Sequence, residues 1–203
     1  MGFYENNILP HVINAMCGMK PIRMQRQKVV PNAAGKVLEV GMGTGLNMPY
    51  YSQDKVDIIY GLEPNAKSCK IAEKAILNAG QNVEMIGLDG QEIPLEKNSV
   101  DTVVLTYTLC TIPDAHKAIA EMRRVLKPGG RLIFSEHGKA PDAAVKKWQD
   151  RINPMWKAVS GGCNINRAIP EFIQSGGFTF ESLEEMYLPG PKFATYTYWG
   201  SAL

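Results

Sequence analysis

One segment, residues 36–47 with the sequence KVLEVGMGTGLN, constrains the fold of this chain more than any other. The apolar run at residues 37–40 is typical of a buried strand, and three glycines follow it at alternate positions, Gly41, Gly43 and Gly45. Glycine adopts positive φ angles without steric cost, so such a loop lets the backbone approach a ligand closely. A buried strand that ends in this way just before a helix predicts a ligand-binding turn in an α/β sheet.

The spacing of the glycines and an adjacent acid narrow the class of ligand. The spacing is G-x-G-x-G, whereas the dinucleotide fingerprint, G-x-G-x-x-G, needs its third glycine one residue later than Gly45. Glu39 lies two residues before the first glycine, and its carboxylate would repel a pyrophosphate but attract a cationic amine. The loop therefore resembles motif I of the class I methyltransferases, whose cofactor, S-adenosylmethionine, carries an amine and a sulfonium and no phosphate. An NAD-binding protein would share the fold but not this glycine spacing.

Composition and charge exclude several other classes of protein. The chain has 203 residues, of which 45% are hydrophobic and 21% charged, as expected for one globular α/β domain spanning residues 1–203. A formal net charge of +2 favours neither a nucleic acid nor an acidic substrate, so the expected partner is a small molecule. Four cysteines, Cys17, Cys69, Cys110 and Cys163, form no C-x-x-C pair and no zinc-site spacing, so we expect reduced thiols and no metal.

The N-terminal segment is basic and amphipathic. Between Asn6 and Leu38 there are five basic residues and no acidic one, which is typical either of a solvated helix face or of a lip that meets an anionic lipid or substrate. We expect residues 1–34 to form a helical lid, in which Leu9, Val12, Ile13 and Met16 cover the cofactor. In the alternative interpretation, this helix lies on a membrane surface. No signal peptide or membrane-spanning apolar run is recognisable, which predicts a cytoplasmic protein, with peripheral membrane contact as the alternative.

Strand and helix patterns alternate along the rest of the chain. We predict seven strands, at residues 37–40, 56–62, 83–87, 100–107, 131–136, 178–188 and 194–199. The predicted helices lie at residues 6–17, 21–30, 66–79, 115–126, 143–159 and 169–175. This order predicts an α/β fold with a doubly wound, mostly parallel sheet, whose ligands bind beyond the carboxyl ends of the strands.

Over about residues 35–140 the chain resembles the type 11 class I methyltransferases. The resemblance implies that Gly41 and Gly43 approach the methionine part of the cofactor and that Glu39 engages its amine through water. It implies that Glu63, at the end of the second strand, binds both ribose hydroxyls and that Asp89 accepts from the adenine amino group. The implied cofactor-binding residues are Glu39, Gly41, Met42, Gly43, Thr44, Gly45, Asn47, Glu63, Pro64, Asp89, Gly90 and Thr106.

The second half of the chain resembles a narrower family. The segments TLCTI, EMRRVLKPGGRLIFSEHG, WQDRINPMW and GGCNINR resemble the methyltransferase-like alkyl thiol methyltransferases. The implied reaction is methyl transfer to a small thiol or to hydrogen sulfide. The alternatives are N-methylation of phosphatidylethanolamine at a membrane surface and a module that binds the cofactor without catalysis.

Three residues near the predicted acceptor are candidates for catalysis. His137, at the end of the fifth strand, titrates near neutral pH and could draw a proton from a thiol, although a structural, hydrogen-bonded histidine is an equal alternative. Glu136 could orient the His137 ring or face the cofactor, and Tyr107 ends the fourth strand beneath the expected methyl group. Cys110 and Cys163 are interpreted as packing residues.

Overall fold

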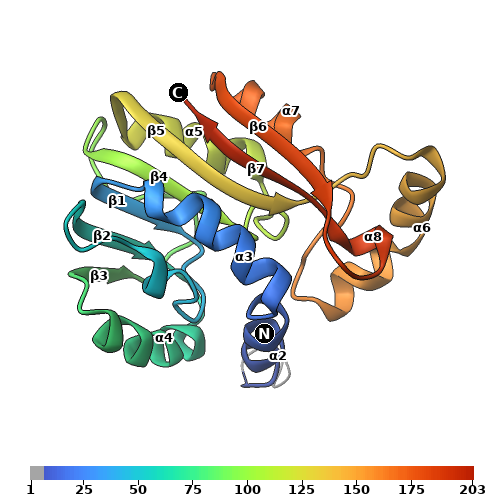
Figure 1. The fold of residues 1–203 in the computed structure, drawn as a ribbon, viewed down its shortest axis with the longest axis horizontal. Coiled ribbons are helices and arrows are strands. Elements are labelled where there is room, and N and C mark those ends of the chain that lie inside the picture. The colour runs from blue at the N-terminus through green and yellow to red at the C-terminus, as the bar shows by residue number, and fades with distance from the viewer. Residues whose placement is uncertain (1–6) are drawn as a thin grey trace.

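The computed structural model describes residues 7–203, so residues 1–6 of the predicted lid lie outside the described part. Seven strands form one sheet in the order β3-β2-β1-β4-β5-β7-β6 (Figure 1). The strands are β1 (Gly35–Val40), β2 (Val56–Leu62), β3 (Val83–Ile86), β4 (Val100–Thr106), β5 (Leu126–His137), β6 (Phe180–Tyr187) and β7 (Tyr196–Ala202). The predicted doubly wound, seven-stranded architecture is therefore confirmed.

The sheet is mostly parallel, and its strand order reverses at β1. Strands β1 to β5 pair in parallel, whereas β7 runs antiparallel to both β5 and β6. The chain winds outward from β1 through β2 to β3 and then returns to β4 on the other side of β1. The connections that follow β1 and β4 therefore lead to opposite sides of the sheet from its carboxyl edge, which is where such sheets bind ligands.

Helices cover both faces of the sheet. The helices are α2 (Leu9–Cys17), α3 (Lys20–Val29), α4 (Ala66–Ala79), α5 (Ala115–Val125), α6 (Ala143–Val159), α7 (Ile169–Ser175) and α8 (Lys192–Thr195). Val37, Val104 and Ile133 pack in a cluster with residues of α3 and α4, whereas the neighbouring Leu38 and Leu132 pack with α5 and α7. Successive side chains of a strand point to opposite faces, so each buried strand supports both layers of helices (Figure 1).

Local signals place several element boundaries correctly. Helix α4 has the predicted bounds: Asn65 accepts hydrogen bonds from two amides of its first turn, and Gly80 ends it at a φ of +63°. Helix α6 also has the predicted bounds and continues through Pro154. Within residues 7–203, none of the helices combines the length and the apolar character needed to cross a membrane.

Three predicted local features differ from the structure. The glycine turn is followed only by a 3-10 turn, Met48–Tyr50, after which Tyr51 folds back onto Glu39. Strand β5 begins at Leu126 rather than at residue 131, and the Lys-Pro-Gly-Gly segment that follows is an irregularity in the pairing with β4. The short helix α8 occupies the first part of the last predicted strand.

Candidate active site

The glycine turn after β1 has two glycines with different surroundings. Gly41 has a φ of +70°, and a Cβ there would lie 2.2 Å from Cγ2 of Thr108, so the turn packs directly against the loop after β4. Gly43 has a φ of +59°, but a Cβ there would meet no described residue closer than 3.9 Å, at the carbonyl of Gly41. Gly43 therefore leaves an open cradle of backbone, which suits the close approach of a ligand, whereas Gly41 serves the packing of the turn.

A buried polar network holds this turn from below. Glu39, 2% exposed, accepts hydrogen bonds from Asn47 Nδ2 at 2.9 Å and from the Tyr51 hydroxyl at 2.8 Å. Arg26 of α3, 5% exposed, donates from Nη1 to Asn47 Oδ1 and to Thr106 Oγ1, each at 2.6 Å. Three predicted cofactor residues, Glu39, Asn47 and Thr106, are thus joined to the N-terminal segment through Arg26.

The carboxyl group of Glu39 has an unusually high pKa in this network. Burial raises the pKa of Glu39 to about 7, although hydrogen bonds from Tyr51 and Asn47 and the nearby charge of Arg26 oppose the shift. Burial also raises the pKa of Tyr51, so its hydroxyl keeps its proton and donates to Glu39. Both oxygens of Glu39 are engaged within the protein, and the contact with a cofactor amine remains a prediction.

Glu63 links the end of β2 to the glycine turn. Its Oε2 accepts from the amide of Gly43 at 2.9 Å, and its Oε1 accepts from the amide of Asn65 at 2.8 Å, at the start of α4. Burial raises the pKa of Glu63, and these two amides oppose the shift. Each carboxylate oxygen has a second lone pair, so Glu63 can still accept from a vicinal diol beside Gly43. The adjacent Pro64 is exposed.

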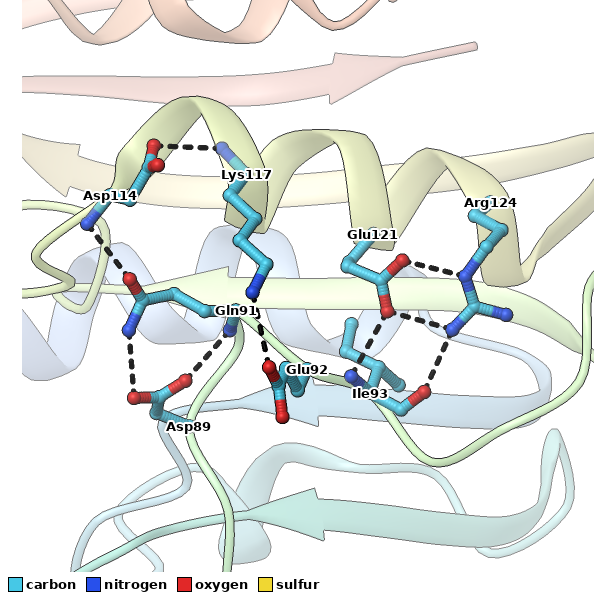
Figure 2. Close-up of polar contacts among 8 residues, drawn as sticks. All are labelled: Asp89, Gln91, Glu92, Ile93, Asp114, Lys117, Glu121 and Arg124. Atoms are coloured by element: carbon cyan, nitrogen blue, oxygen red, sulfur yellow. Dashed lines mark hydrogen bonds and ion pairs between the residues drawn. The ribbon is translucent and has the colours of Figure 1, made fainter.

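Asp89 lies in a loop that is tied to α5 (Figure 2). The two Asp89 oxygens accept from the amide and the side-chain nitrogen of Gln91, at 2.9 and 2.8 Å. Gln91 in turn accepts from the amide of Asp114, the N-cap of α5, and farther along the loop Arg124 donates to the carbonyl of Ile93. Gln91, whose role the resemblance left open, therefore fixes the orientation of Asp89.

Three further predicted cofactor residues, Met42, Gly45 and Gly90, are closely packed against neighbouring segments. The Met42 side chain is buried against Gly61, where a Cβ would lie 2.6 Å from its Sδ. Gly45 packs on α4, where a Cβ on Gly45 would lie 3.0 Å from Ala75 Cβ, and a Cβ on Gly90 would lie 2.8 Å from Val40 Cγ1.

The N-terminal helix contacts the glycine turn through a polar side chain. Asn14 of α2 accepts a hydrogen bond from the Thr44 hydroxyl at 2.5 Å, so α2 does lie against the glycine turn. Leu9 is buried, and Val12, Ile13 and Met16 are 40–43% exposed. The contact of these apolar side chains with a bound cofactor stays a prediction, and the contact of α2 with the turn that the structure shows is the polar one from Asn14.

The catalytic candidates gather at the ends of β4 and β5. The rings of Tyr107 and His137 stack at 6.2 Å between centroids, and Tyr107 has a φ of +54°. Burial raises the pKa of Tyr107 to about 12, so its hydroxyl is protonated at neutral pH. Glu136, fully buried, accepts from the amides of Thr108 and Leu109 and therefore positions the loop after β4.

His137 is paired with a thiol. Its Nε2 lies 3.2 Å from Cys163 Sγ, and its Nδ1 is buried without a hydrogen-bond partner among residues 7–203. Burial lowers the pKa of His137, but the Cys163 thiol and the Glu136 carboxylate more than offset this, so the net shift is upward. His137 therefore contacts a protein thiol rather than standing free beside the acceptor.

The loop between α6 and α7 is hydrogen-bonded to the loop after β4. Asn164 Nδ2 and the Asn164 amide both donate to the carbonyl of Cys110, at 2.9 Å each. Arg167 donates to the carbonyls of Leu109 and Ile112. These residues therefore join the loop between α6 and α7 to the loop after β4.

Sequence reasoning missed two residues of the buried network. Arg26 was interpreted as part of a basic surface, and that interpretation is wrong for Arg26 because its guanidinium is buried against Asn47 and Thr106. Tyr51 carried no recognised signal. No acidic residue lies near Arg26 in the sequence, so no ion pair could be predicted for it. Its partners are neutral side-chain oxygens from segments far away in the chain.

This fold, with a glycine turn at the carboxyl edge of the sheet, is the fold of the class I methyltransferases. A Methyltransferase domain model matches residues 38–134. Human thiol S-methyltransferase TMT1B is 32% identical over 168 residues, covering 80% of this chain and 68% of that protein. The rat protein of the same name is 33% identical over 153 residues, covering 73% of this chain and 62% of that protein. The chain thus spans only about two thirds of the length of these relatives.

A solved structure agrees with these matches at the level of the fold. A methyltransferase from Leishmania major that depends on S-adenosylmethionine has a TM-score of 0.72 and 15% identity, covering 98% of this chain and 80% of that one. The chain belongs to the family of S-adenosylmethionine-dependent methyltransferases that includes the thiol S-methyltransferases. The open cradle at Gly43, bordered by the Glu63 carboxylate, fits the cofactor of that family.

Proposed function

We propose that this chain transfers the methyl group of S-adenosylmethionine to the sulfur of a small thiol. The observation that carries the proposal is the match to human thiol S-methyltransferase TMT1B. Its 168 aligned residues exceed the methyltransferase domain match at residues 38–134 and therefore include part of the chain outside that domain.

The proposed cofactor contacts use the lone pairs that remain on the carboxylate oxygens at the carboxyl edge of the sheet. Glu63 binds the ribose hydroxyls, Asp89 the adenine amino group, and the backbone at Gly43 the methionine part. Asn47, Thr106 and Arg26 hold the turn in place from beneath. When bound, the cofactor supplies an electrophilic methyl group, and the protein supplies alignment and exclusion of water.

A direct assay tests the acceptor. The full chain is incubated with methyl-labelled S-adenosylmethionine and, separately, with an alkyl thiol, sodium sulfide and vesicles that contain phosphatidylethanolamine. We expect a labelled thioether or methanethiol and no labelled lipid. Transfer only to the lipid amine would replace the proposal with phospholipid N-methylation. No transfer to any of them, with S-adenosylhomocysteine still bound, would identify a binding module.

Replacement of Glu63 tests the ribose contact. Glu63→Ala removes charge-assisted hydrogen bonds and should weaken S-adenosylhomocysteine binding by about 1.5–3 kcal/mol in isothermal titration calorimetry. The matched control is Glu73→Ala, because Glu73 is an exposed acid on α4, the helix that Glu63 precedes. Equal affinities of the two variants would show that Glu63 does not hold the ribose.

A further inference from the structure

Three soft metal ligands converge beside the predicted acceptor. Cys110 Sγ, His137 Nε2 and Cys163 Sγ all lie within 4.8 Å of one another, and the Cys163–His137 pair is at 3.2 Å. Zinc binds thiolate sulfur at about 2.3 Å and imidazole nitrogen at about 2.0–2.1 Å, so ligands of one zinc ion lie roughly 3–4 Å apart. The observed separations therefore need only small side-chain movements to share an ion.

The segments that carry these ligands are held firmly. His137 is the last residue of β5 and pairs with Thr197 of β7. Cys110 is 2% exposed, and Asn164, the residue after Cys163, donates twice to its carbonyl. A preorganised ligand set of this kind favours metal binding, because little order must be imposed on the chain when the ion enters.

The donor set is chemically selective. Two thiolates and one imidazole suit zinc and other thiophilic ions, whereas hard cations such as magnesium prefer oxygen ligands. Catalytic zinc sites commonly have three protein ligands and keep one position open, and two cysteines with one histidine form one such set. The cluster supplies three ligands within residues 7–203 and no fourth.

The cluster also lies close to the cofactor turn. Cys110 is two residues after Thr108, whose side chain packs against Gly41. His137 stacks on Tyr107, the residue that follows β4. An acceptor atom held at the cluster is therefore held beside the loop that borders the glycine turn.

We propose that Cys110, His137 and Cys163 bind a zinc ion whose open position takes the sulfur of the acceptor thiol. The part of this inference that concerns the acceptor thiol rests on the proposed function. The part that concerns the metal ion rests on the geometry of the three side chains. A zinc ion stabilises the thiolate over the thiol, which provides the nucleophile that the reaction needs at neutral pH.

The proposed step balances as follows in atoms and charge. The acceptor thiol releases its proton to water as its sulfur binds the ion. That sulfur then forms a bond to the methyl carbon while the bond from that carbon to the sulfonium breaks. The sulfonium sulfur keeps the bonding electrons, S-adenosylhomocysteine leaves, and the neutral thioether, a weaker ligand than a thiolate, dissociates.

Metal binding can be measured without activity. The reduced full chain, stripped with a chelator and titrated with Co²⁺ as a spectroscopic substitute for zinc, should bind one ion with a sulfur-to-metal charge-transfer band and tetrahedral d–d bands. Cys110→Ser and Cys163→Ser should each lower the affinity by more than the roughly 10–100-fold that loss of an outer-shell partner costs. Cys69→Ser is the matched control, because Cys69 lies on α4, outside the cluster. This substitution should leave the affinity for the metal ion unchanged.

The acceptor position is tested on the same sample. Addition of an alkyl thiol to the Co²⁺-loaded protein should strengthen and shift the charge-transfer band, whereas an alcohol of equal length should not. Each variant is first shown to bind S-adenosylhomocysteine, which separates loss of ligands from loss of the fold.

Three results of the metal titrations would overturn the proposal. They are no saturable binding of Co²⁺ or Zn²⁺, binding that survives both serine substitutions, and a metal spectrum that the thiol leaves unchanged. Full thiol methylation by the metal-free protein would also overturn it while leaving the proposed function intact. Conversely, an intact metal site in a protein that methylates only lipid amines would refute the thiol acceptor and not the ion.

Discussion

Gly41→Ala is expected to destabilise the folded chain by about 2–5 kcal/mol. The backbone at Gly41 has a φ of +70°, where an L side chain costs about 1–2 kcal/mol, and its Cβ would lie 2.2 Å from Thr108 Cγ2 and 2.4 Å from Thr108 Oγ1. Relief of such overpacking typically costs a further 1–3 kcal/mol. Urea denaturation followed by circular dichroism measures the change as a lower midpoint at an unchanged slope.

Gly43→Ala is the matched control for this prediction. Gly43 has a similar φ of +59°, but a Cβ there meets no described residue closer than 3.9 Å, so only the backbone cost of about 1–2 kcal/mol applies to folding. Affinity for S-adenosylhomocysteine should nevertheless fall more than about tenfold, because the added methyl group fills the cradle. Equal stability losses at the two glycines would contradict the close packing of the turn on Thr108.

The free energy of unfolding should depend on pH through Glu39. Its pKa is about 7 in the folded chain against 4.5 for an unperturbed glutamate, because burial disfavours the charged carboxylate. The folded state therefore holds this proton more tightly than the unfolded state does. The stability that this provides is complete below pH 4.5 and falls by about 3 kcal/mol as the pH rises to about 7.

Glu39→Gln isolates this contribution. The glutamine amide keeps the shape and one acceptor oxygen for Asn47 or Tyr51 but does not titrate, so the variant should lack the loss between pH 4.5 and 7. Arg124 holds the pKa of Glu121 low, and hydrogen bonding from Lys127 holds that of Asp101 low although burial opposes it; both remain in the variant and cancel in the comparison. Parallel stability curves for the two proteins, measured by urea denaturation across this range, would refute the prediction.

The same curves test the predicted contact with the cofactor amine. A cationic amine near Glu39 favours its charged form and lowers its pKa. Saturating S-adenosylhomocysteine should therefore reduce the difference between wild type and Glu39→Gln above pH 7. A difference that the ligand leaves unchanged would place the amine away from Glu39.

Local patterns predicted the framework because they depend on short-range physics. Apolar runs located all seven strands, and Gly80 marked the end of α4, whose start the structure shows to be capped by the Asn65 side chain. The glycine turn was recognisable because glycine adopts positive φ angles without steric cost, as Gly41, Gly43 and Gly45 do here. Errors occurred where long-range pairing overrode a local signal, as where β5 begins before the Lys-Pro-Gly-Gly segment.

The sequence by itself determined the class of fold, the glycine turn and the segments after the strands that carry Glu63 and Asp89, since each follows from neighbouring residues. Only the tertiary structure decided that Arg26 is buried beneath that turn rather than solvated. It also brought Cys110, His137 and Cys163 within 4.8 Å of one another. No spacing rule finds such a cluster, because its ligands lie on three segments that meet through the strand order and the packing of two loops.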